Sequence, residues 1–350
     1  MSQYRPFRTK WMSYLIDKKA VLYVFFLSIA TLLLLIVSVS IGEMKIHPIE
    51  VVKTLIGMGN EMNELVIKSF RLPRIVLALL AGMALAVSGA ILQGIIRNPL
   101  ASPDIIGITG GASLAVVTFL TIFSGERSSA LTVSIHWLPV AAFIGALTLG
   151  VLVYVLSWRN GVTPVRLVLI GIGLAAAMQA LTNMMILFGP LYLATQAQIW
   201  ITGSVNGANW NQVSTLAPWI IILMVFVWIY ARRLNTQELG EDLARGFGSV
   251  VQRDRMVLLL FSTALAGGAV AFVGGVGFVG LMAPHIARKL VGSSFGALIP
   301  TSALVGALLV MGADLIARTA FSPLEVPAGV FTSALGAPYF IYLLYRSRNQ

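Results

Sequence analysis

Long apolar runs separated by short polar segments are the dominant pattern of this sequence. A helix needs roughly 20 consecutive apolar residues to span a bilayer. A more amphipathic segment at 191–212 contains two tryptophans and is predicted to lie at the outer surface of the membrane, where Trp is favoured. The pattern predicts an all-α polytopic membrane protein of about ten transmembrane helices, at residues 20–41, 71–97, 107–123, 138–158, 167–190, 213–230, 256–272, 276–290, 298–317 and 329–345.

Basic segments frame these apolar runs at both ends of the chain. We predict a basic tail at 1–19, a single transmembrane domain at 20–345 and a second short tail at 346–350. Most of the 24 lysines and arginines fall in segments that ten crossings place on one side of the membrane, both tails included. Positive charge marks the cytoplasmic side. Both termini are therefore predicted to be cytoplasmic, in a multi-pass protein.

Composition supports this interpretation and excludes other classes. The chain is 58% hydrophobic and 11% charged, whereas soluble domains carry roughly 25% charged residues. The net charge of +11 lies mostly in short loops at one end of the helices, so we predict contact with membrane lipid and no nucleic-acid partner. The sequence has no cysteine, which excludes disulfides, thiolate nucleophiles and thiolate metal sites.

The stretch from Arg71 to Ala112 organises the rest of the chain. Arg71 and Arg74 flank a proline at which a helix can begin, and a long apolar helix follows. One face of that helix carries small residues and then an amide, a pattern that lets another helix approach closely and places the amide against protein. The helix is predicted to stop at Asn98-Pro99. The residues of this face are Gly82, Ala86, Gly89 and Gln93.

The groups that an enzyme or a solitary pump needs are missing from the sequence. No G-x-x-x-x-G-K-[ST] phosphate loop occurs, and the three histidines are scattered. We therefore predict no catalytic residues, no metal ligands and no cofactor on this chain. Asp314 is the one acidic residue well inside an apolar run, and Arg318 follows it at i+4, where the two can pair. A structural ion pair and a functional one are both left open.

The largest polar insert, at 231–255, is predicted to be a cytoplasmic loop with two short helix-like pieces, around Glu238–Gly240 and Glu241–Phe247. Three glycines, at 240, 246 and 248, provide turn points. One interpretation is an ordinary solvated connection. The other is a short helix at the membrane base that receives force from a partner.

Several long motifs, in order, resemble the permease subunits of ABC importers for iron–siderophore complexes and cobalamin. These motifs are RLPR at 71–74, SGAILQ at 88–93, RNPLASP at 97–103, GITGGA at 107–112, LGEDLARGFG at 239–248, GFVGLMAPHIARKLVG at 277–292, ADLIAR at 313–318 and PLEVPAG with GAPYF at 323–340. The resemblance implies a type II importer architecture in the bacterial cytoplasmic membrane. It also implies a second permease subunit, identical or paralogous, two ATP-binding subunits that hold ATP and Mg²⁺, and an extracytoplasmic binding protein.

The resemblance also implies roles for particular residues. Arg71, Arg74 and Arg318 are similar to outer arginines that pair with acidic groups on the binding protein; the alternative is that they anchor helix ends. The ATPase-coupling positions implied by the resemblance are Glu238, Gly240, Glu241, Ala244 and Gly248. The sequence departs from the family pattern at Phe247 and at 294–296. Gly89, Gln93, Asn98, Pro99, Pro284 and Asp314 match structural motif positions, and Pro284 with His285 is interpreted as shaping a helix end.

Ferric siderophore is the substrate that the resemblance favours, with cobalamin or haem as the alternative in the same class. A secondary transporter driven by an ion gradient is the alternative from a different class. Two features argue against it. The chain lacks a relay of intramembrane carboxylates, which such carriers use, and LGEDLARGFG would have no role in one.

Overall fold

The computed structural model describes residues 4–8, 13–42, 44–124, 133–189, 191–322 and 324–347. Parts of both predicted tails, the predicted span end at 190 and the first residue of PLEVPAG lie outside these ranges. The elements are β1 Tyr4–Arg8, β2 Ser13–Asp17, α1 Lys18–Ser40, α2 Pro48–Leu55, α3 Glu61–Glu64, the π-helix η1 Leu65–Arg71, α4 Leu72–Ile96, α5 Pro103–Ile106, α6 Ile108–Ile122, the 3₁₀ helix η2 Ile135–Trp137, α7 Leu138–Ser157, α8 Pro164–Phe188, α9 Leu191–Thr202, α10 Trp210–Glu238, α11 Glu241–Gly246, α12 Val251–Val273, α13 Val279–Val291, α14 Phe295–Thr319 and α15 Ala328–Ser347.

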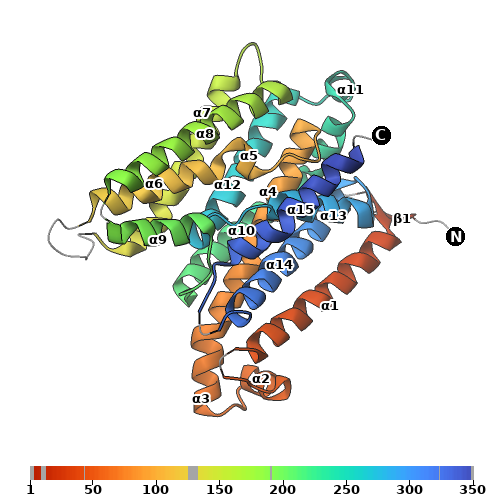
Figure 1. The fold of residues 1–350 in the computed structure, drawn as a ribbon. Helices are drawn as coiled ribbons and strands as arrows, with labels where there is room; N and C mark the ends of the chain where they lie inside the picture. The colour runs from red at the N-terminus through yellow and green to blue at the C-terminus, as the bar shows by residue number, and fades with distance from the viewer. Residues whose placement is uncertain are drawn as a thin grey trace.

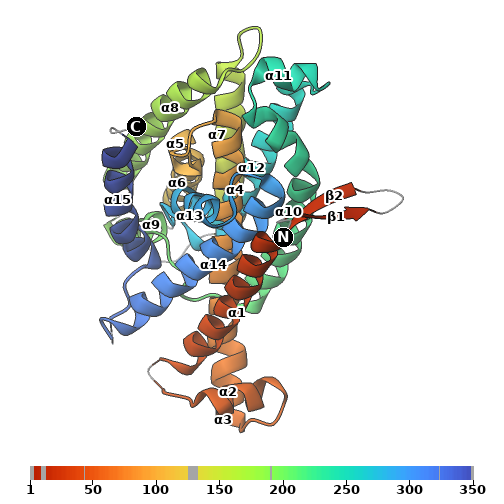
Figure 2. The ribbon, with the colours of Figure 1, turned by 90° about the vertical axis from the view of Figure 1, so that its right-hand side faces the viewer.

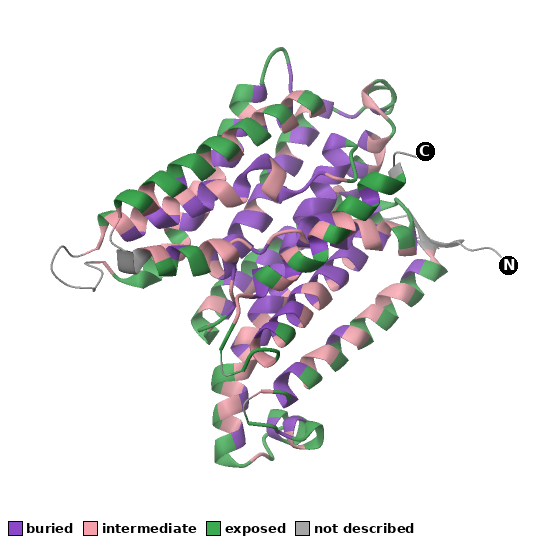
Figure 3. Cartoon of the chain, in the orientation of Figure 1, coloured by how far each residue is buried: buried purple, intermediate pink, exposed green. Residues whose placement is uncertain are grey.

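Helix α4 forms the centre of a helical bundle, with α10, α12, α13 and α14 packed around it (Figures 1 and 2). Almost every α4 side chain after Leu77 is buried. Exposed residues concentrate on the peripheral helices α1, α7 and α8 (Figure 3). Their exposed side chains are mostly large and apolar, such as Phe25, Phe26 and Leu169. Such an apolar exterior is what a bundle surrounded by lipid requires, because lipid cannot satisfy polar groups.

The small-residue face of α4 is where the bundle packs most tightly, as the sequence predicts. A methyl group added at Gly82 would collide with the backbone of Gly306 in α14, and one added at Gly89 would collide with the Gly280 carbonyl in α13. Farther along the same face, Gln93 Nε2 donates to the Leu281 carbonyl at 3.3 Å. Because these glycines remove side-chain bulk, three helix backbones approach one another closely.

The prediction of about ten spanning helices agrees with the fold, although two of these helices are short. Among the described residues, eight helices are long and apolar enough to cross a membrane, and α6 is a shorter apolar helix of 15 residues. Helix α13 has 13 residues, which at 1.5 Å per residue is roughly 20 Å, too short for a 30 Å hydrocarbon core. The predicted spans at 107–123 and 276–290 correspond to these two shorter helices, α6 and α13.

The two ends of the bundle carry different polar features. One end, here called the α2–α3 end, carries the short helices α2 and α3 (Figure 1). The opposite end, here called the α11 end, carries α11, the start of α1 and the end of α15 (Figure 1). Both ends of the transmembrane domain thus lie on one side, as ten crossings predict. Strands β1 and β2 pair antiparallel before α1, a hairpin that the sequence pattern did not predict.

Candidate functional site

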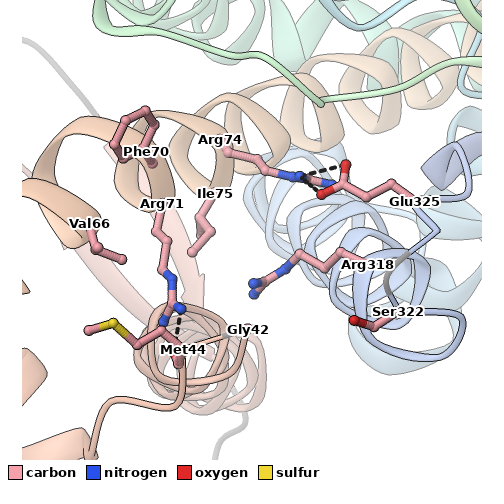
Figure 4. A pocket seen from close by; sticks show the side chains of 10 residues that line it. All are labelled: Gly42, Met44, Val66, Phe70, Arg71, Arg74, Ile75, Arg318, Ser322 and Glu325. Atoms are coloured by element: carbon pink, nitrogen blue, oxygen red, sulfur yellow. Dashed lines mark hydrogen bonds and ion pairs between the residues drawn. The ribbon is translucent and has the colours of Figure 1, made fainter.

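Three arginines gather at the α2–α3 end, at the place where the sequence analysis expected them to share a face. Arg71 ends η1, Arg74 lies in the first turn of α4, and Arg318 lies in the last turn of α14. With Met44 and Glu325 they line a cavity of about 310 Å³ (Figure 4). We call these three residues the arginine cluster.

Arg74 is paired with two carboxylates of the same chain. Its Nε and Nη2 donate to Asp314 Oδ1 at 3.0 and 2.9 Å, and its Nη1 lies 3.0 Å from both carboxylate oxygens of Glu325. The predicted i+4 partner of Asp314 is farther away, since Arg318 Nε lies 3.7 Å from Asp314 Oδ2. The main partner of Asp314 therefore comes from α4 and not from its own helix. Local spacing alone could not reveal this pair, which joins residues 240 apart.

Arg71 and Arg318 hold the end of α1. Arg71 Nη1 donates to the Val39 carbonyl at 2.5 Å, and Arg318 Nη1 donates to the Ile41 carbonyl at 2.6 Å. The last carbonyls of a helix have no amide partner within the helix, so guanidinium groups are suitable donors for them. The anchoring role that the sequence analysis kept as an alternative is thus part of the structure.

Glu325 is the more accessible of the two carboxylates that pair with Arg74. Its side chain is 40% exposed, whereas Asp314 is 3% and Arg74 is 14% exposed. Ion pairs that face water are weaker than buried ones. A carboxylate that entered the cavity could therefore compete with Glu325 for Arg74 more readily than with Asp314.

The predicted loop at 231–255 is mostly helical. Helix α10 continues to Glu238, α11 covers Glu241–Gly246, and α12 begins at Val251. The first helix-like piece expected around Glu238–Gly240 is thus the end of α10, a correction that shortens the loop. We call residues 239–248 the coupling segment. It is bounded by Gly240 and Gly248, whose φ angles of 108° and 77° favour glycine.

The coupling segment exposes two large side chains that the resemblance did not assign to coupling, Leu243 and Phe247. Ala244 is completely buried within the chain, so its side chain cannot face a partner as expected. Leu243 and Phe247 are 57% and 70% exposed at a polar end of the bundle. Exposed apolar side chains at a polar end of the bundle are candidates for contact with another protein. Two apolar residues inside a polar insert were the sequence signal that could have identified them.

Ion pairs attach the last residue of α10 and the first residue of α11 to other helices at the α11 end. Glu238 Oε1 lies 2.8 Å from Arg288 Nη1 of α13, and Glu241 Oε1 lies 2.7 Å from Arg255 Nη2 of α12. Arg245 lies farther from Glu241, at 3.6 Å. The hydrogen bond from Arg255 holds the pKa of Glu241 below its usual value. Glu241 is therefore a carboxylate at neutral pH.

The remaining motif residues shape the backbone around α4. Helix α4 ends at Ile96, two residues before the predicted stop at Asn98-Pro99, and Arg97 follows it with a φ angle of 55°. In the turn that comes next, Asn98 Oδ1 accepts a hydrogen bond from the Leu100 amide at 2.9 Å. Pro284 lies inside α13 and not at its end, which corrects the prediction. Since proline has no amide hydrogen, it cannot bond the Gly280 carbonyl, against which Gly89 packs.

His285 has no features of a metal ligand. Its ring lies beside Tyr339, with centroids 5.8 Å apart. Across the described residues, no group of three or more His, Asp or Glu side chains could hold a metal ion.

The FecCD transport family matches residues 30–346, which include both the arginine cluster and the coupling segment. The chain belongs to this family. It is 56% identical over 333 residues to the probable siderophore transport system permease protein YfhA of Bacillus subtilis, covering 95% of this chain and 97% of that one. It is 48% identical to the achromobactin transport system permease protein CbrC of Dickeya dadantii, covering 92% and 91%.

A solved structure supports the FecCD architecture. The fold is similar, with a TM-score of 0.81 and 28% identity, to a structure described as an inward-facing conformation of a metal-chelate type ABC transporter. The match covers 92% of this chain and 98% of that chain. This FecCD protein is thus a multi-pass transport permease of the ABC importer class.

Proposed function

We propose that this permease carries a ferric siderophore across the bacterial cytoplasmic membrane. The observation that supports the substrate is 56% identity, over nearly the whole chain, to a relative named for siderophore transport. Further relatives are named for ferric hydroxamate and ferric citrate import. Cobalamin and haem remain the alternatives within the class.

The energy for this transport comes from partner subunits. The sequence lacks a phosphate-binding loop, so two ATP-binding subunits would hold ATP and Mg²⁺ and hydrolyse the nucleotide. The α11 end faces the cytoplasm in this proposal, because positive charge marks that side and Arg232, Arg233 and Arg245 lie there. A second permease subunit, identical or paralogous, completes the membrane part.

The arginine cluster would receive an acidic surface of an extracytoplasmic binding protein. Arg71, Arg74 and Arg318 outnumber the carboxylates of Asp314 and Glu325 in and beside the cavity. A carboxylate from the binding protein would replace the exposed Glu325 at Arg74, while Asp314 keeps the guanidinium in place. Anchoring of α1 and docking of a partner are then compatible roles.

This exchange predicts opposite effects from two neutralising variants. Glu325→Gln is expected to strengthen binding-protein affinity about three- to tenfold, because Arg74 loses an internal competitor, whereas Arg71→Gln weakens affinity by a similar factor. Both differences should shrink in high salt, which screens exposed charges. The measurement is the dissociation constant of the binding protein on the permease in lipid nanodiscs. Weaker or unchanged affinity in Glu325→Gln would leave only the anchoring role.

The coupling segment would contact the ATP-binding subunits through Leu243 and Phe247. Since the natural chain has no cysteine, single cysteine substitutions report their own position. Leu243→Cys and Phe247→Cys are expected to crosslink to the ATP-binding subunit, whereas Ala244→Cys is not, because position 244 is buried. The readout is the crosslinked band after treatment of the assembled complex with a short bifunctional reagent. Equal crosslinking at all three positions would contradict this surface.

The transport proposal is tested by uptake in cells that lack this chain and in cells that carry it. Labelled ferric hydroxamate, citrate and catecholate siderophores, cobalamin and haem are compared. Loss of one ferric siderophore class, restored by the gene, supports the proposal, and loss of only cobalamin or haem uptake would replace the substrate. Uptake that survives inactivation of the ATP-binding subunit but collapses with an uncoupler would favour the secondary transporter.

A further inference from the structure

Arg255 is the most unusual buried group outside the surfaces already described. It lies near the start of α12, and its side chain is 2% exposed. It is the largest fully buried side chain among the residues that the structure describes. Burying a guanidinium is costly unless it is paired and hydrogen-bonded. Its partners therefore identify the parts of the structure that this residue holds together.

The partners of Arg255 come from two segments that are distant in sequence. Its Nη2 lies 2.7 Å from Glu241 Oε1, at the start of α11, and its Nη1 donates to the carbonyl of Val162, in the turn between α7 and α8. The planar guanidinium presents several donors in fixed directions. One side chain thus bridges the coupling segment and the α7–α8 turn.

The α7–α8 turn is held to α12 by a second side chain. The Val162 amide donates to Gln252 Oε1 at 2.9 Å, and Gln252 Nε2 lies 3.4 Å from the Val162 carbonyl. Across the turn, Arg166 Nη1 of α8 donates to the carbonyl of Ser157, the last residue of α7, at 3.1 Å. Helix α8 begins two residues after Val162. A displacement of this turn is therefore a displacement of the first turn of α8.

The coupling segment, by contrast, has few other attachments. It is flanked by Gly240 and Gly248, both at positive φ, and Ala244 is the buried side chain of α11. Two glycines can absorb backbone rotation that other residues resist. Without a side-chain tie, α11 could swing about these two positions and leave the rest of the bundle unmoved.

We propose that Arg255 is a positioning residue that ties α11 to the α7–α8 turn, so that a push on α11 is passed to α8. This inference rests on the proposed function, because it assigns the source of the push to the ATP-binding subunits. Movements of packed elements by such rigid ties are an established route of conformational change. In this proposal Glu241 belongs to the coupling segment and also pairs with Arg255 inside the chain.

The test uses Arg255→Lys, with Arg245→Lys as the matched control. A lysine is a single point charge on a flexible stem and cannot hold both acceptors in fixed directions. Arg245 also faces Glu241, but at 3.6 Å and with a side chain 62% exposed. In the complete transporter we expect Arg255→Lys to retain ATP hydrolysis within about twofold, while substrate transported per ATP falls at least about tenfold. Arg245→Lys should leave that ratio unchanged.

A distance measurement on the full permease in nanodiscs tests the tie without transport. Spin labels at Asp242→Cys and Arg159→Cys report on α11 and the α7–α8 turn. A narrow distance distribution that broadens in Arg255→Lys, and in the second variant Glu241→Gln, supports the proposal. An unchanged distribution, or a normal transport-to-ATP ratio in Arg255→Lys, would overturn it. Absence of ATP-dependent uptake in the wild-type transporter would instead refute the proposed function, and the distance result would still decide the tie.

Discussion

Replacing Asp314 by asparagine is expected to lower the free energy of unfolding by about 3–5 kcal/mol, the range found when one partner of a buried ion pair is removed. The Asp314 side chain is 3% exposed and has Arg74 at 2.9 Å and Arg318 at 3.7 Å. Asparagine keeps the shape of the side chain but leaves two largely buried cations with less negative charge. The measurement is denaturant unfolding of the permease in detergent micelles, followed by tryptophan fluorescence.

The control for this variant is Glu325→Gln, which removes a carboxylate from the same Arg74. Because the Glu325 side chain is 40% exposed, its loss is expected to cost about 1 kcal/mol or less. A comparable loss of stability in the two variants would show that burial of the carboxylate does not determine how much its ion pair with Arg74 contributes to the free energy of unfolding. A small loss in both variants would show that the ion pairs of Asp314 contribute little to the stability of the α2–α3 end.

The second large effect is expected at Gly89. In Gly89→Ala the new methyl group would collide with the Gly280 carbonyl of α13, a backbone atom that cannot move aside cheaply. Forcing extra volume into such a contact typically costs about 1–3 kcal/mol. Gly312→Ala in α14 is the matched control, because an added Cβ there has no neighbour within 4 Å. Its stability should stay within about 1 kcal/mol of wild type, because alanine favours a helix.

Both glycine variants are compared by unfolding in micelles and by uptake in cells. We expect Gly89→Ala to lose stability and uptake together, since α4, α13 and α14 meet through this face. Equal stability of the Gly89 and Gly312 variants would mean that the α4–α13 contact, where the added Cβ would lie 1.7 Å from the Gly280 oxygen, can open by more than about 1 Å without cost.

The sequence by itself determined the helical membrane architecture and the place of each motif. Apolar runs require a lipid or protein environment along their whole length, so their existence does not depend on which helices become neighbours. The small face of α4 was also readable, because helical periodicity puts Gly82, Ala86 and Gly89 on one side. The length of α10 was not readable, since hydropathy does not show how far a helix continues beyond the membrane.

Only the tertiary structure decided which charged groups meet. Arg74 pairs with Asp314 across 240 positions, and Arg255 reaches Val162 across 93. The sequence offered Arg318 as the partner of Asp314, because i+4 spacing is the only geometry visible along one helix. It also offered Ala244 as a contact with a partner, although packing buries it in the chain. Periodicity fixes the face of a helix on which a residue lies, but the packing of distant helices decides what that face contacts.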